Sequence, residues 1–211
     1  MARLLISVAL LTMRVTAQPP PLLQIVQERL KPGAERPYGK IEKQLAQLCA
    51  RMHCPNPYLA LVSIASPKEV IWLNEYASSG DVDRVARAYT DNAQLMAAMR
   101  ELSQGKKGLT DEPIDRMGKL RPDLSGASAW RIGELRFAAV LETDTPVKSS
   151  GAVFQVPGGK ALVFSAASDQ AEAQRIASGL SREARVFEVR PEWSLPSQTW
   201  VAKNPGLWKR R

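Results

Sequence analysis

Two neighbouring runs of β-forming residues constrain most strongly what this chain can fold into. The sequences "YLALVSIA" (58–65) and "EVIWLNEYA" (69–77) are rich in β-branched and aromatic side chains, and Ser66-Pro67-Lys68 separates them. A short connection that contains proline is typical of a turn between antiparallel strands. The two runs therefore predict a β-hairpin.

A strand and a helix are predicted before this hairpin. Residues 22–30 are expected to form a strand that stops at Pro32-Gly33. An apolar set then repeats at spacings of three and four, which predicts a helix with one buried face and a polar face in water. The apolar set is Tyr38, Ile41, Leu45, Leu48 and Met52, and the polar set is Lys40, Glu42, Lys43, Gln44 and Gln47. Pro55 and Pro57 end this helix.

A helical segment and a short strand are predicted after the hairpin. Ser79 or Asp81 is expected to cap the helix, and Asn92 to cap its continuation. The apolar face of this segment is formed by Val82, Val85, Ala86, Tyr89, Leu95, Met96, Met99 and Leu102. After "QGKKG", a strand is expected near residues 113–117, and "RPDLSGAS" is typical of a linker.

The second half repeats much of this order. We expect strands over 134–143 and within "GAVFQVPGGKALVFSA", where Pro157-Gly158-Gly159 forms the turn, then a helix over 168–180 and a strand over 184–190. Strand, helix, strand, strand, helix, strand is thus followed by strand, strand, strand, helix, strand. This order suggests an internal duplication in which the second copy lacks its first helix.

The N-terminal residues "MARLLISVALLTMRVTAQ" have the pattern of a secretory signal peptide. A basic start precedes the apolar stretch from Leu4 to Met13, and small residues follow at Val15 and Ala17. We expect cleavage after Ala17 and a secreted or periplasmic protein. The apolar stretch is about half of the ~20 residues that a spanning helix needs, so no permanent membrane span is predicted.

The net charge of the chain does not identify a binding partner. The formal net charge is +8, and it falls to +6 when residues 1–17, which hold Arg3 and Arg14, are left out. The basic residues are widely spread, and the cluster in the terminal "LWKRR" is too short to predict nucleic-acid binding. We interpret the excess as a solvated surface with a charged tail; the alternative is contact with anionic lipid, cell wall or polymer.

Four segments carry a resemblance: "LLQIVQERLKPG", "CPNPYLAL", "PKEVIWLNEYAS" and "AYTDNAQLMAAM". They resemble a group of uncharacterised secreted bacterial proteins whose first half is similar to the ferredoxin-like domains of the antibiotic-biosynthesis monooxygenase and NIPSNAP type. The likeness continues more loosely through "RPDLSGASAW" and "VRPEWSLPSQTW". It implies a four-stranded antiparallel sheet with two helices on one face, and two such sheets pair into an α+β barrel.

We therefore expect an α+β protein with two ferredoxin-like halves. The expected segments are a signal peptide (1–17), a ferredoxin-like domain (22–120), a linker (121–133), a reduced second half (134–192) and a Trp-rich basic arm (193–211). The barrel would form within the chain or through a homodimer. The class includes cofactor-independent monooxygenases acting on phenolic or quinoid substrates, haem-degrading enzymes and members without known activity. The fold alone therefore does not identify the function.

One strand carries the residues best suited to a ligand pocket. Along residues 69–77 side chains alternate, so Trp72, Asn74 and Tyr76 share one face with Val70. The resemblance implies a pocket between sheet and helices lined by Trp, Asn and Tyr, where Trp72, Asn74, Tyr76 and Tyr89 would serve by analogy. The alternative is that Trp72 and Tyr76 are core or interface aromatics and Asn74 a polar group at a strand edge.

The only histidine, His53, and the two cysteines, Cys49 and Cys54, lie together but lack the spacing of a known cofactor site. Haem attachment needs C-x-x-C-H, thioredoxin-like chemistry needs C-x-x-C at a helix start, and structural zinc needs four ligands. A serine hydrolase motif and a glycine-rich phosphate loop are also missing from the sequence. We predict no cofactor and no metal, and, in an exported chain, a Cys49–Cys54 disulfide that contributes ~2 kcal/mol and fixes the turn.

The C-terminal arm contains Trp193, Trp200 and Trp208, and prolines lie between them in the sequence. We expect the indoles to pack over the domain; the alternative is an aromatic platform for a sugar or peptide. The leading hypothesis is a protein that binds a small apolar or aromatic ligand, or a partner, without an assigned catalytic residue. The rival hypothesis is a cofactor-independent monooxygenase-like enzyme acting on a phenolic or quinoid substrate.

Overall fold

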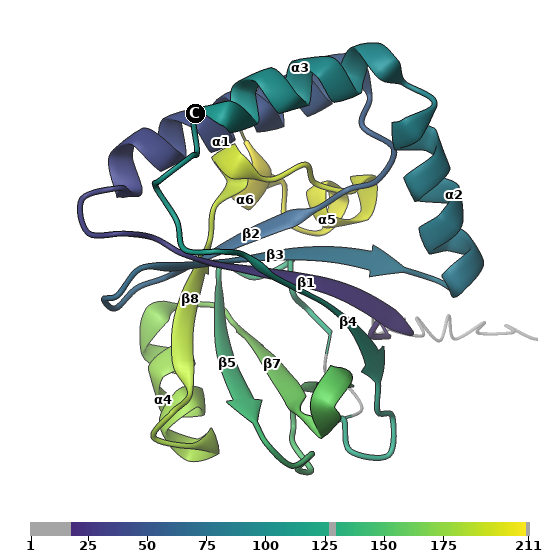
Figure 1. Cartoon of the computed structure of the whole chain (residues 1–211). Coiled ribbons are helices and arrows are strands. Elements are labelled where there is room, and N and C mark those ends of the chain that lie inside the picture. The colour runs from purple at the N-terminus through teal and green to yellow at the C-terminus, as the bar shows by residue number, and fades with distance from the viewer. Residues whose placement is uncertain (1–17, 127–129, 210–211) are drawn as a thin grey trace, which may run out of the picture.

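Eight antiparallel strands form one closed barrel in the computed structural model (Figure 1). The structure describes residues 18–126 and 130–209. The predicted signal peptide (1–17) and the last two basic residues, Arg210 and Arg211, lie outside the described residues. Within the described ranges, no helix is long and apolar enough to cross a membrane.

The first half has the ferredoxin-like strand order. Its elements are β1 (Leu22–Arg29), α1 (Glu35–Met52), β2 (Leu59–Ser63), β3 (Glu69–Tyr76), α2 (Ser79–Thr90), α3 (Ala93–Gln104) and β4 (Ile114–Leu120). In space the strands lie in the order β4-β1-β3-β2, all antiparallel. The predicted hairpin is β2 and β3.

The second half repeats this strand order, but it has no counterpart of α1 and has a single helix where the first half has α2 and α3. Its elements are β5 (Phe137–Thr143), β6 (Ala152–Gln155), the 3-10 turn η1 (Pro157–Gly159), β7 (Ala161–Ala167), α4 (Gln170–Leu180) and β8 (Arg185–Val189). The strands lie in the order β8-β5-β7-β6, so each strand has the neighbours that its counterpart has in the first half. Pairing of β2 with β8 and of β4 with β6 closes the barrel within one chain.

The interior of the barrel is filled by the chain's own side chains. Alternate residues of the strands point inward and form the largest apolar cluster, in which Trp130, Phe154 and Phe164 meet edge to face. After β8 the chain forms η2 (Pro191–Trp193), and the C-terminal arm then adds α5 (Gln198–Lys203) and α6 (Pro205–Trp208). Trp200 and Trp208 stack on each other and join this cluster, as expected for indoles that pack over the domain.

The helices lie outside the barrel. Figure 1 shows α1, α2 and α3 arranged over the outer face of the first half, and α4 beside the second. The cap of α2 differs from the prediction: Ser78, rather than Ser79 or Asp81, accepts from the Asp81 backbone N–H, while the Asp81 carboxylate accepts from the Ala77 N–H. This reciprocal arrangement places the cap one residue earlier. Asn92 caps α3 as predicted.

The amphipathic pattern of α1 predicts the wrong environment for one residue. Glu42, assigned to the polar face, is 4% exposed. A charged side chain is rarely buried without a partner. The reason for its burial lies in the polar cluster described below.

Candidate functional site

The outer face of β1 and β3 carries the predicted pocket residues. Antiparallel pairing sets Gln24 opposite Asn74 and Val26 opposite Trp72, so these four side chains share that face. Trp72 and Asn74 are partly exposed and Tyr76 is buried. Their neighbours Ile71 and Leu73 point into the barrel, which confirms the predicted alternation.

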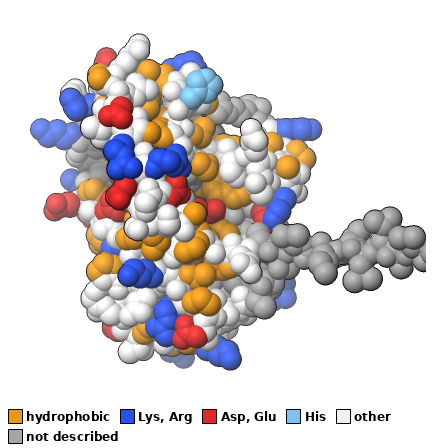
Figure 2. Space-filling model, turned by 90° about the vertical axis from the view of Figure 1, so that its right-hand side faces the viewer, with side chains coloured by type: hydrophobic (Ala, Val, Ile, Leu, Met, Phe, Trp, Pro, Cys, Tyr) orange, Lys and Arg blue, Asp and Glu red, His pale blue; other side chains and the backbone are white. Residues whose placement is uncertain are grey.

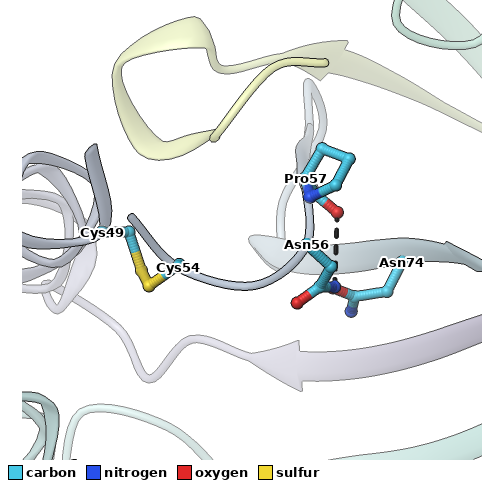
Figure 3. Close-up of a disulfide and its surroundings, with 5 residues drawn as sticks. All are labelled: Cys49, Cys54, Asn56, Pro57 and Asn74. Atoms are coloured by element: carbon cyan, nitrogen blue, oxygen red, sulfur yellow. Dashed lines mark hydrogen bonds between the residues drawn. A yellow bond between two sulfur atoms is a disulfide. The ribbon is translucent and has the colours of Figure 1, made fainter. Parts of the chain in front are cut away.

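Hydrogen bonds hold in place the row formed by Trp72, Asn74 and Tyr76, here called the aromatic row. Asn56 Nδ2 donates to Asn74 Oδ1 over 2.8 Å, and Figure 3 shows the two amides turned toward each other. The Tyr76 hydroxyl donates to Gln24 Oε1 over 3.2 Å. The ring of Tyr58 meets that of Trp72 edge to face at 5.9 Å between centroids. The Asn74 NH₂ group donates to no protein group among the residues that the structure describes.

Tyr89 comes from α2 rather than from the sheet. It is half-buried, and burial, with a smaller effect of the nearby Tyr76, raises the pKa of Tyr89 to about 12. On the side of the molecule where α2 lies, hydrophobic side chains form a band between charged groups (Figure 2). The structure thus places all four predicted residues on one side of the first-half sheet.

A buried polar cluster adjoins this row. It consists of Glu28 on β1, Tyr38 and Glu42 on α1, and Lys106 in the turn after α3. Glu28 is 7% exposed, and Lys106 Nζ lies 3.2 Å from Glu28 Oε1 and 2.7 Å from Glu42 Oε1. The Tyr38 hydroxyl donates to Glu28 Oε2, and Trp72 Nε1 lies 3.5 Å from the same oxygen.

Burial dominates the electrostatics of the cluster. It raises the pKa of Glu42, although the Lys106 ammonium opposes the shift. It also raises the pKa of Tyr38 far above the usual value, with Glu42 and Glu28 adding to the effect. Burial lowers the pKa of Lys106, but Glu42 and Glu28 outweigh it and the net shift is upward. The cluster holds two carboxyl groups for one ammonium, and shifted pKa values of this kind occur at functional sites as well as in structural ion-pair networks.

Sequence reasoning missed this cluster, although two signals for it exist. Tyr38 and Glu42 are four residues apart on a helix and therefore lie on the same face. Glu28 continues the alternation of Gln24 and Val26 along a predicted strand. Only the packing of α1 against β1 brings these two signals together.

The cysteine segment forms the turn that leads to Asn56. Cys49 and Cys54 are bonded, as predicted, with their Cα atoms 4.8 Å apart. His53 adopts a left-handed conformation with φ 54° and ends α1. In residues 18–126 and 130–209 no three His, Cys, Asp or Glu side chains are grouped as metal ligands would be.

A second titratable group lies on the inner face of the barrel. Trp130 Nε1 donates to Glu75 Oε1 over 2.7 Å. Burial, with a smaller contribution from Glu134, raises the pKa of Glu75 to about 7, against the lowering effect of this hydrogen bond. Glu75 thus changes its charge near neutral pH, but its side chain faces away from Asn74.

Two hollows lie apart from the row. One, of about 500 Å³, lies between α1 and the C-terminal arm, and the other, of about 390 Å³, lies between α4 and β8. Neither is lined by Trp72, Asn74, Tyr76 or Tyr89.

Comparisons with known proteins give only distant likenesses. No family model and no curated protein matches the chain. A proposed monooxygenase of Fusobacterium nucleatum is 9% identical, with 85% of this chain and 94% of that chain covered and a TM-score of 0.49. A proposed chlorite dismutase is 11% identical (83% and 97% covered, TM-score 0.45), and a proposed monooxygenase of Lactobacillus acidophilus 6% (90% and 90%, TM-score 0.43). At this level of similarity none of them assigns a function to the chain.

Proposed function

We propose that this protein is exported and binds a small apolar or aromatic ligand on the outer face of its first half, at Trp72, Asn74, Tyr76 and Tyr89. The observation that carries the proposal is the state of Trp72 and Asn74. Both stay partly exposed on a sheet face that lies beneath helices, and the Asn74 NH₂ group has no partner among the described residues. An aromatic surface and an unused donor are two of the kinds of contact that ligand sites combine.

The chemistry of the row favours a ring that carries an oxygen. The Trp72 indole offers an aromatic surface for stacking, and the Asn74 amide offers a donor to a phenol or quinone oxygen. The bond from Asn56 fixes the orientation of that amide before a ligand arrives. A preorganised donor loses less entropy on binding than a free one.

Titration with 2-naphthol, a neutral phenol, followed by calorimetry, tests the binding site. Asn74→Ala removes the donor and should weaken binding by about tenfold, in line with ~1.4 kcal/mol for one hydrogen bond. Trp72→Ala should weaken it further. Trp200→Phe alters an indole in the barrel core and serves as the control. Equal affinity in the wild type and both row variants would exclude this site.

Catalysis on a phenol is the second candidate function. One observation favours it: the Glu28 carboxylate lies within 3.5 Å of Trp72 Nε1, so a proton acceptor adjoins the aromatic row. An oxygenase without cofactor would use such a group to deprotonate its phenolic substrate. Oxygen uptake with phenols and quinols that Glu28→Gln abolishes would support this function. Ligand binding without oxygen uptake would leave the protein as a binder.

The disulfide supports export, because such bonds persist in oxidising compartments. Intact mass of protein recovered from medium or periplasm tests this part of the proposal. Cleavage after Ala17 and the absence of free thiols in that material are the expected results. Full-length protein retained in the cytosol with two free thiols would contradict it.

A further inference from the structure

The hollow of about 500 Å³ between α1 and the C-terminal arm has a charged rim and an apolar floor. Lys43, Ala46 and Gln47 line it from α1, and Gly206, Leu207 and Lys209 from the arm. The remaining lining residues are Arg136, Pro191 and Glu192. Lys43, Ala46 and Gln47 are three and four residues apart, so one face of α1 forms a wall of the hollow.

The rim holds more positive than negative charge. Three basic residues, Lys43, Arg136 and Lys209, line the hollow, and Glu192 is the one acidic residue among its lining residues. Arg136 is already paired with Glu188 over 2.8 Å. Lys43 and Lys209 have no carboxylate within 4.0 Å among the residues that the structure describes. Two ammonium groups are therefore free to meet an anion.

The floor is suited to a nonpolar body. Ala46 is 2% exposed, Leu207 packs against the barrel core and Pro191 is half-buried. A volume of about 500 Å³ lies in the range of sites for organic molecules rather than single ions. A bare inorganic anion would leave this floor uncovered.

We infer that this hollow binds an organic anion, a molecule with an apolar body and a carboxylate or sulfonate group that Lys43 and Lys209 contact. None of the lining residues is Trp72, Asn74, Tyr76 or Tyr89, so binding in this hollow is independent of the proposed function. Neutral aromatic ligands would bind at one face of the chain and amphipathic acids at another.

Two matched probes separate charge from apolar contact. The probes are 1-anilinonaphthalene-8-sulfonate, which is anionic, and N-phenyl-1-naphthylamine, its neutral counterpart. Both report binding by fluorescence. Lys43→Gln and Lys209→Gln should each lower the affinity for the anionic probe by about threefold, the effect of one exposed ion pair, and leave the affinity for the neutral probe unchanged. Added salt should weaken the anionic probe in the wild type, because exposed charges are screened.

A third variant should change the affinity in the opposite direction. Glu192→Gln removes the one lining carboxylate and should raise the affinity for the anionic probe by about twofold. Lys148→Gln, an exposed lysine in the loop between β5 and β6, is the control and should change nothing.

Three results would overturn the inference. The first is an affinity for the anionic probe that Lys43→Gln, Lys209→Gln and Glu192→Gln all leave unchanged. The second is an equal loss of affinity in the control variant. The third is a loss of affinity for the anionic probe in Trp72→Ala alone. The last result would place that probe on the aromatic row and support the proposed function instead. Failure of 2-naphthol to bind, with the charge effects intact, would contradict the proposed function and leave this inference standing.

Discussion

The ammonium group of Lys106 lies 2.7 Å from a carboxylate oxygen of Glu42, and this ion pair joins the turn after α3 to α1. Glu42 is 4% exposed, so its charge depends on this partner. The same ammonium reaches Glu28 on β1. One side chain therefore links two helical segments to the sheet beneath the candidate site.

Lys106→Met should lower the free energy of unfolding by about 2–4 kcal/mol at pH 8, because it leaves two buried carboxyl groups without a cation. The loss should be smaller at pH 5. Burial already raises the pKa of Glu42, and a carboxyl group with a raised pKa supports the folded state when protonated and opposes it as pH rises. Urea denaturation at both pH values measures the difference. Lys107→Met, at the exposed neighbour, is the control, and a loss independent of pH would contradict this account.

Glu75 should make stability depend on pH near neutrality. Its pKa rises from 4.5 to about 7 on folding, so the folded state binds the proton more tightly. The stabilisation is complete below pH 4.5 and is lost as pH rises to about 7, a change of about 3 kcal/mol, since one pKa unit corresponds to about 1.4 kcal/mol. Glu75→Gln keeps an acceptor for Trp130 and should be more stable than the wild type at pH 8. Tryptophan fluorescence against pH should show a step near 7 that the variant lacks.

The alternation and spacing of apolar residues were enough to predict the elements and their order: the hairpin of β2 and β3, the buried face of α1 and the repeated element order all come from local periodicity. The antiparallel sheets and the barrel were expected only from the resemblance to ferredoxin-like proteins, and the structure has them. The disulfide was predictable as well, because Cys49 and Cys54 are close in sequence at a helix end.

The polar cluster could not be predicted in the same way. Glu42 has the sequence surroundings of a solvated residue, and its burial depends on Lys106, which lies sixty-four positions later in the chain. The hollow beside the C-terminal arm has the same origin, since α6 meets α1 only through the folding of the whole chain. Contacts between distant segments leave no periodic signal in the sequence.

Removal of the disulfide should affect both stability and the candidate site. Cys49→Ala combined with Cys54→Ala should lower the free energy of unfolding by ~2 kcal/mol, because the closed loop is short. Asn56 follows Cys54 by two residues and orients Asn74, so 2-naphthol should also bind less tightly. Urea denaturation and calorimetry measure the two effects. Unchanged affinity in the destabilised variant would show that the turn positions Asn56 without the bond.

Gly39→Ala should destabilise the protein although it improves helix propensity. A Cβ at Gly39 would lie 2.6 Å from Trp193 Cζ2, and that indole is 7% exposed and packs edge to face on Tyr38. Alanine contributes about 1 kcal/mol to a helix, whereas forcing an indole out of place costs about 1–3 kcal/mol, so a net loss of about 1 kcal/mol is expected. In α4, a Cβ at Gly179 meets no atom within 4 Å, so Gly179→Ala should instead stabilise by up to about 1 kcal/mol. Thermal denaturation of the two variants should therefore give shifts of opposite sign; a rise in both would show that Trp193 moves without loss of its contacts.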